Sequence, residues 1–126
     1  MYEVGVVAHF EAAHRLIGDF GPAQRMHGHT YRVEVSVRGP QLAPDGTLVD
    51  IGVVQTALRT IVDSFHYQNL DDLAVFHGKN STAEVVAAVI CDTVMAALQQ
   101  RGLASIRVAV WESGQAWAAV QREFAS

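Results

Sequence analysis

The segment Thr30–Arg38 alternates strictly between apolar and polar side chains, and this alternation is the strongest structural constraint in the sequence. The apolar positions are Tyr31, Val33, Val35 and Val37. The polar positions between and after them are Arg32, Glu34, Ser36 and Arg38. Because successive side chains of a strand point to opposite faces, the pattern predicts a β-strand with one buried and one wet face. Other elements of the chain must cover the buried face.

Three further segments, Tyr2–Glu11, Ser105–Glu112 and Ala116–Phe124, are predicted to be strands. The first is rich in β-branched and aromatic residues, the second has apolar residues at alternate positions, and the third has mixed parity. Residues 12–29, between the first two strands, are irregular. A long loop in a compact domain is more often functional than filler.

Two segments are predicted to be helices. Asp50 has the position of an N-cap, and apolar residues at helical spacing follow it over 52–64. The tetrapeptide Ser81–Glu84 has the pattern of a capping box, so a second helix is expected to begin there. Gly102 is the expected end of that helix, because glycine is common just after the last helical turn.

The predicted order is strand, strand, helix, helix, strand, strand, so that two hairpins flank a helical pair. This order predicts an α+β fold with a four-stranded antiparallel sheet and two helices on one face. We expect residues 1–126 to form a single domain, since neither a linker nor a repeat divides them. Such a sheet has open edges, which neighbouring subunits could pair.

Composition and charge argue against several classes of protein. Half of the residues are hydrophobic and 17% are charged, which excludes a disordered tail. A net charge of -4 without a basic patch argues against nucleic-acid binding. The longest uninterrupted apolar run, Val85–Cys91, is far shorter than the roughly 20 residues of a membrane span. Residues 1–20 lack the pattern of a secretion signal, so we expect a cytoplasmic protein without a membrane partner.

Three histidines are candidate ligands of a metal ion. His27 and His29 are two residues apart at the start of a strand, so both imidazoles project to the same side. His14 lies just beyond the first strand, and pairing of the two strands would bring it close. Three neutral imidazoles with one open position are the ligand set of a catalytic zinc. Two histidines at this spacing are a weak signal on their own, and a structural role is the alternative.

Six segments resemble, in order and in spacing, the family of 6-pyruvoyltetrahydropterin synthase and 6-carboxytetrahydropterin synthase. They span about residues 3–113 and are FEAAHRL (10–16), HGHTYRVEV (27–35), LVDIGVVQTAL (48–58), NLDDL (69–73), NSTAE (80–84) and VWES (110–113). The resemblance implies the tunnelling fold, in which trimers close into a barrel and two trimers often stack as a hexamer. It therefore implies a homo-oligomer with pterin sites between subunits.

The same resemblance assigns the metal and the ligand contacts. It places the family's zinc ligands on His14, His27 and His29, so Zn²⁺ is the expected cofactor. It places the pterin-anchoring glutamate on Glu112, and Thr82 and Glu84 on a second pterin-contact segment. The site residues implied by the family are thus His14, His27, His29, Glu112, Thr82 and Glu84.

A carboxylate suits the anchoring role, because it can accept two parallel hydrogen bonds from the aminopyrimidine edge of a pterin. The alternative for Glu112 is a solvated charge at the end of a strand. The alternative for Thr82 and Glu84 is helix capping, which is compatible with a ligand contact.

The groups that transfer protons in the family are altered here. The family cysteine, four residues before the HGH tripeptide, is Ala23, and a methyl group cannot take a proton. The family's Asp-His pair falls on His66 and Tyr67 or, with a one-residue gap, on Phe65 and His66, so the pair is broken on either alignment. Cys91 is the only cysteine, and its place in the second predicted helix indicates a small core thiol.

We therefore expect a homologue that binds a pterin-like heterocycle between subunits, with a metal on the three histidines, and that performs the usual synthase reaction inefficiently. Loss of one general base typically removes about 10²–10⁴-fold of rate. The alternative is an active lyase with altered chemistry, such as cleavage of the dihydroneopterin side chain, in which His66 or Tyr67 transfers the proton. A binding or assembly protein without catalysis is a further alternative.

Overall fold

The structure is a computed structural model that describes residues 1–98 and 102–125. Its helices and strands are β1 (Tyr2–His14), β2 (His27–Gly39), α1 (Ile51–Phe65), β3 (Gln68–Asn69), α2 (Ala83–Ala97), β4 (Ser105–Trp111) and β5 (Trp117–Glu123). Short 3-10 turns over Gly21–Gln24, Leu70–Asp72 and Ala74–Phe76 lie in the connections. The predicted α+β class and the order of the main elements are confirmed.

The strands form one sheet in the order β3-β1-β2-β4-β5. The pairs β1–β2, β2–β4 and β4–β5 are antiparallel, as predicted. The prediction of four strands missed β3, whose two residues pair in parallel with Ala12 and Ala13 near the end of β1. A strand this short carries no alternation, because a periodic signal needs about four to eight residues.

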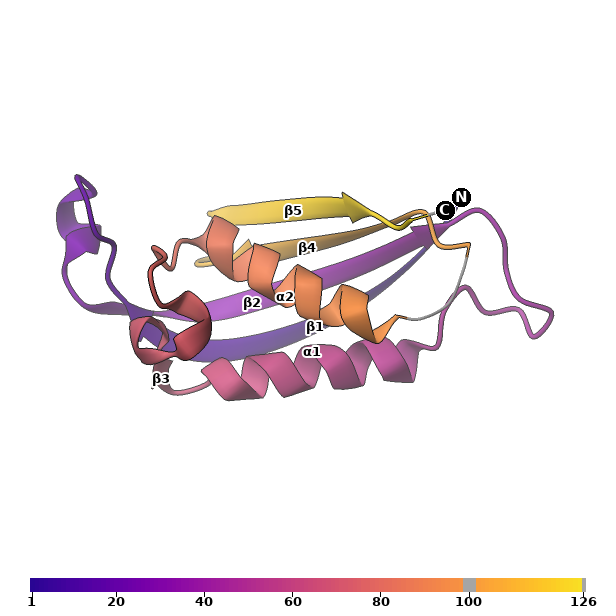
Figure 1. The fold of residues 1–126 in the computed structure, drawn as a ribbon, viewed down its shortest axis with the longest axis horizontal. Helices are drawn as coiled ribbons and strands as arrows, with labels where there is room; N and C mark the ends of the chain where they lie inside the picture. The colour runs from indigo at the N-terminus through magenta and orange to yellow at the C-terminus, as the bar shows by residue number, and fades with distance from the viewer. Residues whose placement is uncertain (99–101, 126) are drawn as a thin grey trace.

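Both helices pack against the same face of the sheet, and the hydrophobic core lies between them and the strands (Figure 1). The predicted apolar face of β2 is fully buried there, and no member of it is more than 1% exposed. From α1 the core receives Val54, Leu58 and Val62, which recur every fourth residue and so share one helix face. Burial of these faces is the main source of stability in a domain of this kind.

The hairpin β1–β2 is longer than predicted and extends as far as the histidines of the candidate metal site. Its register places His14 opposite His27, and Ala12 opposite His29. The strand ends were underestimated because alanine and glycine, here Ala12 and Gly28, are depleted in strands. Continuous antiparallel pairing overrides that weak local preference.

Side-chain caps set the start of each helix. The Asp50 carboxylate accepts a hydrogen bond from the Gly52 amide at 2.8 Å, which confirms the predicted N-cap of α1. In α2 the N-cap is Thr82, whose hydroxyl oxygen accepts from the Val85 amide at 3.2 Å. The capping-box pattern had placed the cap one residue earlier, on Ser81, and that assignment is wrong because Ser81 uses its hydroxyl elsewhere.

Two further expectations concern α2, namely where the helix ends and whether Cys91 is buried in it. The helix ends at Ala97; residues 99–101, over which it was predicted to continue, lie outside the described residues. Gly102 beyond them has φ 88°, a left-handed conformation that favours glycine. Cys91 is fully buried in α2, as predicted, and burial raises the pKa of its thiol. Within the described residues, neither helix combines the length and the apolar character needed to cross a bilayer.

Candidate functional site

The side chains of His14, His27 and His29 lie together, where β1 ends and β2 begins. This end of the β1–β2 hairpin lies opposite the chain termini (Figure 1). One ring nitrogen from each histidine lies within 4.8 Å of the other two. The β1–β2 register explains this cluster, because His14 faces His27 directly and His29 follows two residues later on the same face. The predicted grouping of the three imidazoles is confirmed; their role as metal ligands stays a prediction.

Backbone hydrogen bonds orient two of the three rings. Nδ1 of His14 lies 2.8 Å from the carbonyl oxygen of Ser81, and Nδ1 of His27 lies 2.7 Å from that of Arg25. A carbonyl oxygen only accepts, so each Nδ1 carries a hydrogen, and in the neutral imidazole each Nε2 keeps its lone pair. This is the arrangement that metal-ligating histidines adopt.

The cluster also contains unsatisfied nitrogen atoms. Nε2 of His14 and Nε2 of His29 are buried and have no hydrogen-bond partner among the described residues. Buried polar atoms without partners are rare and need an explanation. A Zn²⁺ ion fits this donor set, because it takes three imidazole nitrogens and keeps one position open.

Glu112, at the end of β4, lies directly beside the cluster. Its Oε2 is 3.8 Å from Nε2 of His29, and 29% of the Glu112 side chain is exposed. Burial lowers the pKa of His29, and the nearby Glu112 carboxylate opposes this shift. The carboxylate is therefore neither a freely solvated charge nor a fully buried one.

A cavity of about 230 Å³ connects the predicted ligand contacts. It is lined by Leu16, Phe20, Thr82, Ala83, Glu84, Glu112, Ala116, Trp117 and Ala118. The three residues predicted to contact a pterin, Thr82, Glu84 and Glu112, thus share one cavity in a single chain. Whether they bind a ligand stays a prediction.

No thiol lies beside the histidines. Ala23 occupies the turn Gly21–Gln24, in the loop that projects beyond the end of the sheet (Figure 1). Its carbonyl oxygen accepts from the Leu16 amide at 2.9 Å, so the residue helps to close the loop. The chain's single cysteine, Cys91, is buried in the middle of α2.

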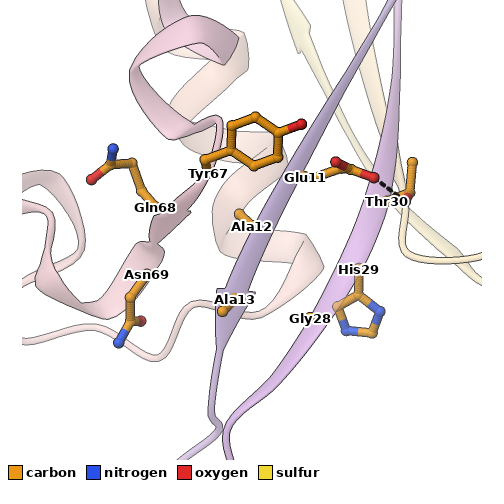
Figure 2. A pocket seen from close by; sticks show the side chains of 9 residues that line it. All are labelled: Glu11, Ala12, Ala13, Gly28, His29, Thr30, Tyr67, Gln68 and Asn69. Carbon is orange, nitrogen blue, oxygen red and sulfur yellow. Dashed lines mark hydrogen bonds between the residues drawn. The ribbon is translucent and has the colours of Figure 1, made fainter.

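His66 and Tyr67 lie between α1 and β3, where both contact the edge of β1. Nδ1 of His66 accepts from the Glu11 amide at 3.0 Å, and the Tyr67 amide donates to the Glu11 carbonyl oxygen at 2.6 Å. Tyr67 has φ 57° and is 76% exposed. It lines a shallow depression of about 520 Å³ with Glu11, Thr30 and His29 (Figure 2). Within one chain, neither of the two lines the cavity formed by Thr82, Glu84 and Glu112, whereas Tyr67 shares its depression with His29 of the cluster.

Two residues that matter for the site were missed by the sequence analysis. The Ser81 hydroxyl donates to Oδ1 of Asp71 at 2.6 Å, and Oδ2 of Asp71 accepts from the Arg15 amide at 3.0 Å. Both residues fall in segments that were noticed, NLDDL only as part of the family resemblance and NSTAE as a capping and ligand-contact motif. Local sequence patterns could not show this contact, because Ser81 and His14 are 67 positions apart in the sequence and come together only in the fold.

The order of strands, the helical pair and the histidine cluster define a protein of the tunnelling-fold class. A family model described as 6-pyruvoyl tetrahydropterin synthase matches residues 3–123, and the chain belongs to that family. It is 32% identical over 102 residues to 6-carboxy-5,6,7,8-tetrahydropterin synthase of Bacillus subtilis, with 77% of this chain and 68% of that protein covered.

Two further comparisons agree with this membership. The chain is 32% identical over 105 residues to 6-pyruvoyl tetrahydrobiopterin synthase of Drosophila melanogaster, with 72% of this chain and 62% of that protein covered. The fold matches 6-pyruvoyl tetrahydropterin synthase of Caenorhabditis elegans with a TM-score of 0.81, at 24% identity and with 96% and 95% of the two chains covered. The predicted family and fold are therefore confirmed, and a role in pterin metabolism follows from the family.

Proposed function

We propose that this protein binds a pterin, or a similar bicyclic heterocycle, with Glu112 as the anchor. The observation that carries the proposal is the place of the Glu112 carboxylate, 3.8 Å from a ring nitrogen of the histidine cluster and on the wall of the cavity shared with Thr82 and Glu84. A carboxylate there can accept two parallel hydrogen bonds from an aminopyrimidine edge. The synthase names of the Bacillus and Drosophila relatives support a pterin as the ligand.

We propose that His14, His27 and His29 hold a Zn²⁺ ion beside that ligand. When bound, the metal would polarise a ligand oxygen or lower the pKa of a bound water. The chain's own contribution is to present nitrogen lone pairs on Nε2, which the hydrogen bonds of Nδ1 to the carbonyl oxygens of Ser81 and Arg25 favour on two of the rings.

The usual synthase reaction is expected to be inefficient in this protein. The alanine at position 23 removes the family thiol, and the chain's one cysteine is enclosed in the core. The altered pair, His66 and Tyr67, no longer supplies the family's carboxylate and imidazole. Each lost proton-transfer group typically lowers a rate by about 10²–10⁴-fold.

A second candidate function is a lyase with altered proton chemistry. The exposed phenol of Tyr67 favours it, because such a group is free to meet a substrate held by a neighbouring copy. The Tyr67 ring contacts His66 in a tilted arrangement, with centroids 3.9 Å apart. One solved relative, from Plasmodium vivax, is described as a catalytic-residue mutant in which a glutamate is replaced by alanine. A catalytic group other than a thiol is therefore recorded for that synthase.

The ligand site would be completed by a second copy of the chain, in a cytoplasmic trimer or hexamer. Among the described residues, β5 pairs only with β4, and β1 pairs with β3 only at Ala12 and Ala13. Both edges of the sheet therefore offer backbone groups to another copy. A strictly monomeric protein in solution would contradict this part of the proposal.

One preparation of purified protein tests these statements together. We expect one zinc per chain, saturable binding of neopterin, and no 6-pyruvoyl or 6-carboxy product from dihydroneopterin triphosphate. Absence of pterin binding would overturn the anchor assignment, and formation of either standard product would overturn the predicted inactivity. Turnover of dihydroneopterin that disappears in Tyr67→Phe, with neopterin binding retained, would establish the second candidate.

A further inference from the structure

We propose that Asp71 is a positioning residue that fixes the tautomer of His14 and so keeps the Nε2 lone pair of that ring available to a metal. The inference rests on the proposed metal site, and it is independent of which ligand binds and of whether any reaction occurs. It concerns a chain of three side chains, Asp71, Ser81 and His14, contributed by three separate segments.

Ser81 lies between the carboxylate and the imidazole. Its Oγ donates to Oδ1 of Asp71 at 2.6 Å and is 3.3 Å from Nδ1 of His14. Its carbonyl oxygen is 2.8 Å from the same Nδ1. Ser81 is 0% exposed and His14 is 1% exposed, so bulk water does not reach the contacts between these two residues.

The number of available hydrogens determines the tautomer. A serine hydroxyl has a single hydrogen, and an ionised carboxylate only accepts. Because that hydrogen is given to Asp71, Ser81 faces Nδ1 of His14 with lone pairs alone, from both its hydroxyl and its carbonyl oxygen. Nδ1 must then carry a hydrogen, and Nε2 is left with the lone pair that a metal needs.

Without the carboxylate, the serine hydrogen would be free to turn toward His14. Donation to Nδ1 would stabilise the other tautomer, in which Nε2 carries the hydrogen and cannot ligate. His27 has no such competition, because its Nδ1 faces only the Arg25 carbonyl oxygen in the described contacts. The carboxylate is therefore needed specifically behind His14.

Backbone contacts hold the Asp71 carboxylate in place. Oδ2 accepts from the amide of Arg15, the residue after His14, at 3.0 Å. The Asp71 amide donates to Oδ1 of Asn69 at 3.0 Å. The carboxylate thus joins the end of β1 to the segment before α2, and its orientation does not depend on the serine alone.

The first test reads the tautomer directly in the metal-free protein. Long-range ¹H–¹⁵N spectra of protein labelled with ¹⁵N-histidine distinguish the two neutral tautomers. We expect His14 of the wild type to carry its hydrogen on Nδ1, and Asp71→Asn to populate the form with hydrogen on Nε2. The matched control is Asp72→Asn, which makes the same change of charge at the neighbouring residue, and that residue is exposed. Wild-type protein with hydrogen on Nε2 of His14 would overturn the proposal, whether or not any variant folds.

The second test measures zinc affinity by competition with a chelator. Asp71→Asn should weaken zinc binding by roughly 10- to 100-fold, the usual effect of losing a residue that orients a ligand, and Asp72→Asn should leave it unchanged. Adding Ser81→Ala to Asp71→Asn should restore most of the affinity, since it removes the hydrogen that competes for Nδ1 and keeps the backbone carbonyl. Equal effects of the two aspartate variants, or no rescue by Ser81→Ala, would overturn the proposal. Failure of pterin binding alone would leave both tests unaffected, so the two proposals fail separately.

Discussion

Oε2 of Glu112 lies 3.8 Å from Nε2 of His29, so the proposed ligand anchor and one proposed metal ligand are direct neighbours. They come from different strands, β4 and β2, which pair in the sheet. Glu112 follows the last residue of β4. Because its carboxylate is next to His29, it faces the same space as the proposed metal position. One ligand can contact both, with a hydrogen-bond-donating edge on the carboxylate and an oxygen near the metal.

Replacing Glu112 by glutamine should weaken neopterin binding by roughly 10- to 100-fold, because hydrogen bonds to a charged group are worth about 1.5–3 kcal/mol. Fluorescence titration of neopterin measures the affinity. The control is Glu3→Gln, whose carboxylate is 51% exposed on β1. Equal affinity in the wild type and in Glu112→Gln, with zinc content unchanged, would remove Glu112 from the binding site.

Removing the metal should lower the melting temperature of the wild type. A ligand present at 100 times its Kd stabilises the native state by about 2.7 kcal/mol, and chelation with EDTA withdraws that stabilisation. His27→Gln should melt at the same temperature with and without EDTA, whereas the exposed His77→Gln should keep the wild-type difference. A His27→Gln protein that still responds to EDTA would place the metal elsewhere.

The features that could be predicted from the sequence are those that depend on local patterns. The alternation along β2 and the cap at Asp50 arise within a few residues, so they were visible in the sequence. The short strand β3 and the extension of β1 to His14 depend on pairing with distant segments. For the same reason the histidine cluster followed from spacing plus the hairpin, whereas the link from Asp71 to His14 through Ser81 did not.

Tyr31 shows another limit of sequence reasoning. Its place on the buried face of β2 was predicted, but a periodic pattern does not show what the hydroxyl contacts. The hydroxyl is fully buried without a hydrogen-bond partner among the described residues, and its ring stacks on Phe10 with centroids 4.6 Å apart. Burial and the carboxylates of Glu112 and Asp71 raise the pKa of this phenol.

Tyr31→Phe should therefore leave the metal-free protein as stable as the wild type, or more stable by up to about 1 kcal/mol. The substitution removes an unpaired buried polar atom and keeps the ring in its stack. Urea denaturation monitored by circular dichroism gives the free energy of unfolding. A loss of more than about 1 kcal/mol, the net value of a typical hydrogen bond, would show that the hydroxyl has a partner.

Cys91 should react slowly with a thiol reagent in the native protein and fast in guanidinium chloride. Burial raises the pKa of its thiol above the ordinary value, Asp92 adds to this shift, and Arg122 opposes it. The native state thus holds the thiol proton more tightly than the unfolded state does. Stability should accordingly fall as the pH rises through and above the ordinary thiol pKa.

The rate of modification and the unfolding free energy, each followed against pH, measure these two effects. Cys91→Ala is the control for the pH dependence, because it lacks the titrating group, and its stability should fall less over the same range. Rapid native modification near neutral pH would contradict the buried position. It would also restore Cys91 as a candidate for the missing thiol.

Tyr67→Gly should raise the free energy of unfolding by about 0.5–1 kcal/mol. The φ of 57° is left-handed, and that conformation costs a non-glycine residue about 1–2 kcal/mol, which is partly offset by the greater freedom of glycine in the unfolded chain. The matched control, Gln68→Gly in β3, relieves no such strain and should lower the free energy by about 0.5–1 kcal/mol. Urea denaturation of the two variants gives the comparison. A destabilised Tyr67→Gly would mean that the contact of its ring with His66 outweighs the strain. A stabilised variant would show that Tyr67 holds its exposed phenol at a cost to folding, which is the pattern expected of a residue kept for contact with a substrate or a second subunit.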